Sequence, residues 1–143
     1  MSNESLIEAI KAALQKYSGI ELNQPNDDTL LIKCNNSEDG IDITLLSSSR
    51  EYTLYFNKFH WHFDKNDDES SQIINLIVGA LMGNVRVQEF SKNGQPYKWK
   101  LEVFDADKEW KYFGTSTVFN ADFWTTPQIK YFRNDSSIIS VID

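Results

Sequence analysis

The sequence predicts an α+β fold in which two helices pack on one face of a mostly antiparallel sheet of about six to seven strands. Two segments carry apolar residues at helical spacing, several others alternate apolar with polar residues, and short turns separate the alternating segments. The expected order is a helix, three or four strands, a second helix and three or more strands. With 143 residues, 41% of them hydrophobic, the chain suits a single domain covering 1–143.

The first half of the chain is expected to begin with a helix. Ser5 and Glu8 match a capping box, a stripe of apolar residues follows at helical spacing, and Gly19 is suited to end the helix. The polar run 23–28 is expected to be a loop. Strands are then expected at 29–34, 41–46, 52–56 and 59–63, with a tight reversal at Asn57-Lys58. A single long strand bent at Asn57 is the alternative to this last hairpin.

The second half is expected to start with a helix capped by Asn66, with Glu69 three residues later, and to end at Gly83-Asn84. Asn93-Gly94 is a strong hairpin signal, because both turn residues need positive φ. It predicts a hairpin of 85–90 with 97–103. Further strands are expected at 110–115, at 117–120 and, after a break at 126–127, at 129–132. The tail 134–143 is expected to be either flexible or docked on the domain.

Charge and cysteine content limit the classes of partner and the compartment. The chain has 14 basic and 21 acidic residues, a net charge of −7, and its basic residues are scattered along the sequence. We therefore expect no nucleic-acid partner, since such binding rests on neutralising phosphates. One cysteine, Cys34, excludes an internal disulfide, and no apolar run is long enough to cross a membrane. A cytoplasmic protein is expected, and a composition rich in Asn, Ile and Lys favours a bacterial one; the oligomeric state stays open, a homodimer included.

One alternating segment offers a set of metal ligands. His60, His62 and Asp64 are spaced to share one face of a strand, which could form a two-His-one-carboxylate site. The competing interpretation is a solvated strand face, with Asp64 leading into the following helix cap. An enzyme or small-molecule site using His60 and His62 stays a secondary alternative.

The aromatic-rich final third is the most distinctive feature of the sequence. The polar run 120–127 carries Phe123 and Trp124 beside Asp122, and Trp110 lies a little earlier. Exposed aromatic side chains in loops often anchor a partner, since they bury much area at little entropic cost. We therefore assign partner binding to Phe123, Trp124, Asp122 and Trp110. Two alternatives stay open: the loop could fold back over the core, or Trp124 could stack on a sugar.

Signals of catalysis are weak throughout the chain. Cys34 could be a nucleophile assisted by a histidine, but it closes an apolar strand, which favours a buried thiol. The acidic spacing of 105–109 resembles a calcium loop but lacks its glycine and its final glutamate, so a charged turn is expected. No phosphate-binding, dinucleotide-binding, nucleophile-elbow or zinc-protease motif is present. We predict no cofactor and no catalytic residue.

Two families share coarse features with the chain. The order α-βββ-α-ββ in a small acidic protein is similar to class I type III secretion chaperones, which implies a dimer that binds an extended effector segment. The segment Phe59-His-Trp-His-Phe-Asp64, followed by an acidic cap and an apolar helix, resembles small bacterial toxin-immunity proteins, which implies inhibition by binding. The sequence therefore predicts a non-catalytic protein-binding module, of immunity type, for a basic partner.

Overall fold

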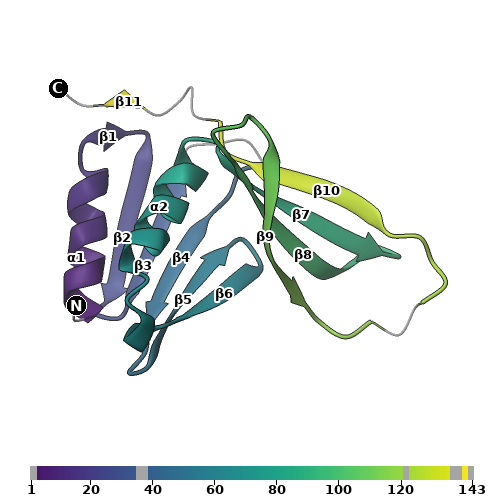
Figure 1. Ribbon diagram of the computed structural model, residues 1–143, viewed down its shortest axis with the longest axis horizontal. Helices are drawn as coiled ribbons and strands as arrows, with labels where there is room; N and C mark the ends of the chain where they lie inside the picture. Colours follow the sequence, from purple (N-terminus) through teal and green to yellow (C-terminus); the bar gives the residue numbers. More distant parts are fainter. Residues whose placement is uncertain (1–2, 35–38, 121–122, 136–139, 142–143) are drawn as a thin grey trace.

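The computed structural model describes residues 3–34, 39–120, 123–135 and 140–141. It confirms the α+β class, with two helices and antiparallel strands (Figure 1). The single sheet predicted from the sequence is wrong, because the strands divide into a five-stranded and a four-stranded sheet plus one short pair. Alternation tells which face of a strand is buried, but it does not tell which strands become neighbours.

The five-stranded sheet is an antiparallel meander in the first half of the chain. Its strands follow each other in sequence order, β2-β3-β4-β5-β6. Asn57 has φ 54 in the turn between the last two strands, so the predicted hairpin is confirmed and the single bent strand is excluded. The elements of this half are α1 (Asn3–Leu14), β1 (Tyr17–Ser18), β2 (Ile20–Asn26), β3 (Thr29–Cys34), β4 (Ile43–Ser47), β5 (Glu51–Phe56) and β6 (Phe59–Asp64).

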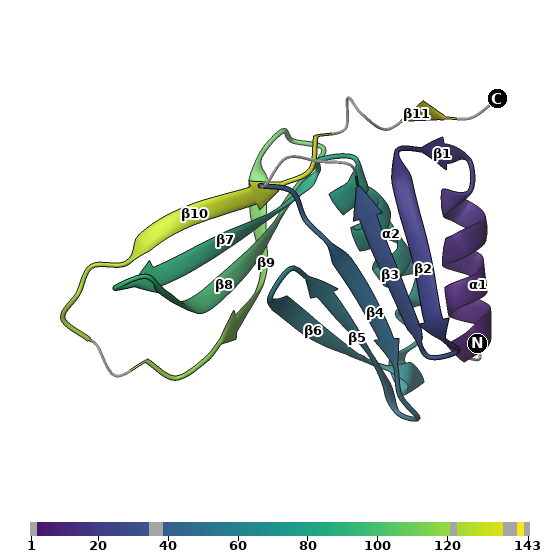
Figure 2. The same cartoon turned by 180° about the vertical axis from the view of Figure 1, so that it is seen from behind.

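Both helices lie on the same face of the five-stranded sheet, as predicted. A 3-10 turn, η1 (Lys65–Asp67), leads into α2 (Ser70–Leu81). Figure 1 shows α1 and α2 in front of the sheet, and Figure 2 shows the same helices behind it. Their apolar faces and the inward side chains of β3 to β6 form one buried cluster, which includes Leu6, Ile10, Ile73, Ile77, Leu30, Ile43, Leu54 and Phe56.

The four-stranded sheet contains the second half of the chain. It consists of β7 (Val85–Lys92), β8 (Gln95–Phe104), β9 (Trp110–Thr117) and β10 (Gln128–Arg133), in the spatial order β10-β7-β8-β9. Asn93 and Gly94 have φ 53 and 76, which confirms the predicted hairpin. Trp99 and Leu101 are buried, while Lys98 and Lys100 lie on the opposite face, as the alternation predicts. In the tail, β11 (Ser140–Val141) pairs with β1.

Several predicted boundaries in the first half are wrong. The sequence predicts a loop at 23–28, yet Ile20–Asn26 forms β2. This edge strand tolerates Pro25, because the missing N–H of proline needs no ladder partner at an edge. The first helix ends at Leu14, well before Gly19, whose positive φ serves the link between β1 and β2. The capping box predicted at Ser5 is also wrong, because α1 already starts at Asn3 and Ser5 lies within its first turn.

The cap predicted for the second helix is also misplaced. Asp64, not Asn66, is the capping residue: its carboxylate accepts a hydrogen bond from the Asn66 N–H at 2.8 Å and so starts η1. The α-helix itself begins later, after Glu69, whose side chain makes no cap hydrogen bond. Gly83 has φ 81 just after α2, so the predicted stop is confirmed. Among the described residues, neither helix is long and apolar enough to cross a membrane.

The buried hydroxyl of Tyr52 on β5 is expected to lower the stability of the fold. Its side chain is 4% exposed, and its hydroxyl has no hydrogen-bond partner among the described residues. Burial, with a further contribution from the Asp68 carboxylate, raises the Tyr52 pKa above 10.0. We expect Tyr52→Phe to raise the free energy of unfolding by about 1 kcal/mol at neutral pH, because an unsatisfied buried hydroxyl is removed.

The gain from Tyr52→Phe should grow at alkaline pH. The unfolded protein loses the tyrosine proton near pH 10.0 while the folded protein keeps it, so ionisation destabilises only the wild type in this range. Urea unfolding at neutral pH and above pH 10 measures both effects. Tyr55→Phe, on the half-buried neighbour in the same strand, is the matched control. A Tyr52→Phe protein less stable than wild type would show that the hydroxyl is satisfied after all.

Candidate functional site

The connection between β9 and β10, residues 118–127, is called the aromatic loop here. Three of its aromatic side chains are almost fully solvent-exposed: Phe119 at 88%, Phe123 at 74% and Trp124 at 94%. Figure 1 shows this connection at the end of the molecule remote from the helices. The structure therefore places Phe123 and Trp124 on the surface, and the alternative in which they cover the core is not what the fold adopts.

The position of the aromatic loop follows from the order of the strands. β9 and β10 are the two outer strands of their sheet, so the chain between them must pass the ends of β7 and β8. The strand pairing ends where the Val118 N–H donates to the Tyr97 carbonyl, and the described residues between there and β10 belong to no strand. Large apolar side chains gathered on a surface in this way mark interaction sites more often than they serve stability.

Two further residues of this surface are not among the binding residues that the sequence predicts. Val118 is 54% exposed and Phe119 is more exposed than Phe123. The sequence predicts both residues in a short strand, 117–120, but β9 ends at Thr117 and the pairing with β8 does not continue beyond it. The sequence does contain a sign that 118–119 is not part of such a strand. A half-buried strand alternates apolar with polar residues, whereas Val118 and Phe119 are two large apolar residues in succession.

Trp110 does not join the aromatic loop. It begins β9, and the loop follows the other end of this eight-residue strand, about 23 Å away. Its ring packs edge-on against Phe104 at 5.1 Å, and the Arg86 guanidinium lies 4.3 Å from its centroid. Trp110 is thus half-buried in contacts within its own sheet. Asp122, the remaining residue assigned to partner binding, lies outside the described residues.

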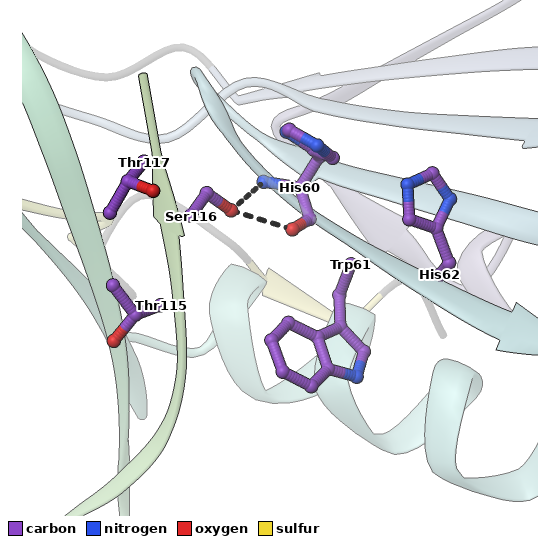
Figure 3. A pocket seen from close by; sticks show the side chains of 6 residues that line it. All are labelled: His60, Trp61, His62, Thr115, Ser116 and Thr117. Carbon is purple, nitrogen blue, oxygen red and sulfur yellow. Dashed lines mark hydrogen bonds between the residues drawn. The ribbon is translucent and has the colours of Figure 1, made fainter. Parts of the chain in front are cut away.

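A second surface feature is a groove between β6 and β9, the edge strands at which the two sheets approach each other. Its volume is about 400 Å³. One wall is β6 and the other is β9, as Figure 3 shows. Residues distant in sequence meet here, and the lining consists of His60, Trp61, His62, Thr115, Ser116 and Thr117. For brevity it is called the β6–β9 groove.

Ser116 and Gly114 hold the two strands of the groove together. The Ser116 hydroxyl accepts a hydrogen bond from the His60 N–H at 3.1 Å and donates one to the His60 carbonyl at 2.7 Å (Figure 3). A side chain thus satisfies the edge of β6 where no strand pairs with it. Below this contact the Trp61 ring lies against Gly114, with Phe113 edge-on to the ring at 5.4 Å. The groove therefore has a rigid base.

The two histidines share one side of β6, as predicted, but Asp64 does not join them in a metal site. The ring centroids of His60 and His62 are 5.4 Å apart. His62 Nδ1 lies 2.9 Å from the Thr53 hydroxyl and 3.2 Å from a Glu51 carboxylate oxygen. The Asp64 carboxylate is turned to cap η1 instead. Within the described parts of the chain, no three His, Cys, Asp or Glu side chains are grouped to hold a metal ion.

The acidic run 105–109 is held by hydrogen bonds to a single carboxylate. The Asp105 carboxylate accepts hydrogen bonds from the Asp107 and Glu109 N–H groups at 2.9 and 3.2 Å, and Lys108 has φ 62. The acidic run 105–109 is therefore a turn built on Asp105, as expected. The side chain of Cys34 lies outside the described set.

Comparison of the chain with models of protein families, with curated proteins and with solved structures gives no match.

Proposed function

We propose that this protein is a non-catalytic protein-binding module that binds its partner through the aromatic loop. The observation that carries the proposal is the exposure of Phe119, Phe123 and Trp124 within one short connection. Tryptophan and other aromatic anchors dominate the energetics of protein interfaces when a partner's pocket desolvates them. Each buries a large area and loses few rotamers on binding. A loop held at both ends by strands presents such anchors in a restricted set of positions.

The proposed partner is basic, because the negative charge of the chain is concentrated on one side of the fold. Up to Asn84 the sequence has 13 acidic and 6 basic residues, whereas from Val85 onward it has 8 of each. The whole net charge of −7 thus belongs to the helices and the five-stranded sheet. Such a field speeds the encounter with a basic protein and weakens as salt screens it. The aromatic loop then holds the partner by burial, which salt affects little.

The concrete version of the proposal is inhibition of immunity type, in which a toxin or enzyme of basic charge is blocked by a tight complex. The acidic half attracts the partner and the aromatic loop provides the anchor. These two roles can be distinguished by kinetic measurements. Substitutions that change the charge of the acidic half should alter the association rate, whereas substitutions in the aromatic loop should alter the dissociation rate.

The test is a quantitative comparison of proteins that co-purify with tagged variants from the source organism. Phe123→Ala with Trp124→Ala should lower recovery of the partner at least tenfold, because truncating two anchors costs an interface about 2 kcal/mol or more. The partner should be basic, and the purified complex should show an association rate that falls with ionic strength.

The control is Tyr112→Ala, which removes an aromatic side chain that is 64% exposed on β9 and lies outside the loop. It should leave recovery of the partner unchanged. Equal loss with this control would mean that exposed aromatics bind nonspecifically. Full recovery of a stoichiometric partner by the double variant would place the interface elsewhere and refute the role of the loop.

A further inference from the structure

The side chains that line the β6–β9 groove are all uncharged hydrogen-bonding or aromatic groups, apart from the titratable histidines. They are two imidazoles, three hydroxyls and one indole. Lysine and arginine do not line the groove, so nothing in it selects for a phosphate or carboxylate. The Glu51 carboxylate beside the groove is engaged with His62 Nδ1 at 3.2 Å. The chemistry of the lining therefore favours a neutral ligand with many hydrogen-bonding groups.

Several groups in the groove have capacity for hydrogen bonds that the fold does not use. Among the described residues, the ring nitrogens of His60 and the hydroxyl of Thr117 have no hydrogen-bond partner. The Ser116 contacts show that the N–H and C=O of His60 point away from β5. Because these directions alternate along a strand, the N–H and C=O of His62 also point to this open edge. Donors and acceptors are thus offered by both side chain and backbone.

The base of the groove is apolar and held in place. The Trp61 ring is stacked parallel to Phe59, with centroids 6.1 Å apart and planes at 5°, and Phe113 meets it edge-on. Figure 3 shows the indole on the side of β6 opposite to the two imidazoles. The groove thus combines neutral hydrogen-bonding groups with one apolar ring at its border. This combination suits a sugar, whose C–H groups are apolar and whose hydroxyls form hydrogen bonds.

We propose that the β6–β9 groove binds a neutral carbohydrate of one or two rings. Its volume of about 400 Å³ lies within the range of small-molecule sites. His60, His62 and Thr117 would bond the sugar hydroxyls, and the rigid contact between Ser116 and β6 keeps the two walls in place. This site is separate from the aromatic loop and does not depend on the proposed protein partner.

The experiment is an NMR titration of the ¹⁵N-labelled full chain with neutral sugars. The probes are maltose, cellobiose and chitobiose, each raised to about 20 mM, since sites of this kind bind in the millimolar range or tighter. Glucose 6-phosphate is the charged comparison. Binding should shift the amide signals of residues 60–62 and 115–117. The double variant Phe123→Ala with Trp124→Ala should bind the sugar like wild type, which separates this site from the protein interface.

Two isosteric variants locate the contact. Thr117→Val removes a hydroxyl on the groove and should weaken binding about tenfold, the usual effect of one lost hydrogen bond. Thr126→Val makes the same change on an exposed threonine of the aromatic loop and should have no effect. The proposal is overturned if no neutral sugar shifts the groove signals, if glucose 6-phosphate alone does so, or if Thr117→Val and Thr126→Val behave alike.

Discussion

Replacing Asn134 by alanine is expected to lower the free energy of unfolding by about 3 kcal/mol. Asn134 is 3% exposed and lies directly after β10. Its side-chain oxygen accepts a hydrogen bond from the Ile41 N–H at 2.7 Å. Its amide nitrogen donates to the Ala80 carbonyl at 3.0 Å and to the Ile41 carbonyl at 3.3 Å. Three parts of the fold therefore meet at one side chain: the approach to β4, the end of α2 and the end of β10.

The size of the expected loss follows from what Asn134→Ala leaves behind. The Ile41 N–H would stay buried without its partner, which costs about 1–3 kcal/mol. The Ala80 carbonyl would lose the amide but keep the hydrogen bond from the Gly83 N–H at 3.3 Å. A small cavity adds to this cost. The contact with Ile41 also spans 93 residues, so its loss loosens the link between the end of the four-stranded sheet and the five-stranded sheet.

Urea unfolding followed by circular dichroism measures the loss. Asn75→Ala is the matched control, because Asn75 lies exposed on α2 and alanine is a better helix former. The control should be neutral or slightly stabilising. A loss below about 1 kcal/mol for Asn134→Ala would mean that water replaces the amide, and the side chain would then not be a link between the sheets.

The elements that the sequence predicted well are those with strong local signals. The hairpin at Asn93-Gly94, the stop at Gly83 and the alternation around Trp99 are all local, and all three are confirmed. β2 was missed because its residues include Pro25 and a polar run typical of loops; it forms through pairing with β3, a tertiary effect that no local pattern reports. The division into two sheets was missed for the same reason.

The candidate sites divide in the same way. Composition alone pointed to Phe123 and Trp124, because two large aromatics in a polar run are unusual. The β6–β9 groove could be foreseen on one side only, from the pair His60 and His62. The other wall is β9, which contacts β6 through Ser116 and His60, two residues 56 positions apart in the sequence. Alternation within β6 gives no information about such a partner.

Gly114→Ala is expected to lower the free energy of unfolding by about 2–3 kcal/mol, because it forces apart the two strands that line the groove. A Cβ atom at this position would lie 2.5 Å from Trp61 Cζ3 and 2.9 Å from two further ring atoms. The indole cannot move aside easily, since Phe59 stacks against it and Phe113 meets it edge-on. The added methyl must therefore displace β9 or push Trp61 out of its rotamer.

A second substitution separates this clash from a general intolerance of alanine at Gly114. Trp61→Phe shortens the side chain, so that the outer ring of the indole, whose atoms the alanine methyl would meet, is no longer present. In this background Gly114→Ala should cost less than about 1 kcal/mol, and the difference is the coupling energy of the pair. Gly79→Ala is the control for glycine replacement. It lies within α2, its Cβ would meet only Val85 at 3.4 Å, and alanine favours the helix by up to about 1 kcal/mol.

Urea unfolding of the four variants, with the groove amides followed by NMR, tests this account of the junction. The Gly114→Ala protein should show its largest shift changes at His60, Trp61 and Ser116, because the two hydrogen bonds of Ser116 to β6 require the close approach that the glycine permits. Equal losses for Gly114→Ala with Trp61 or phenylalanine at position 61 would show that the indole is not what limits the site. The junction would then depend on the backbone of β9 rather than on packing against Trp61.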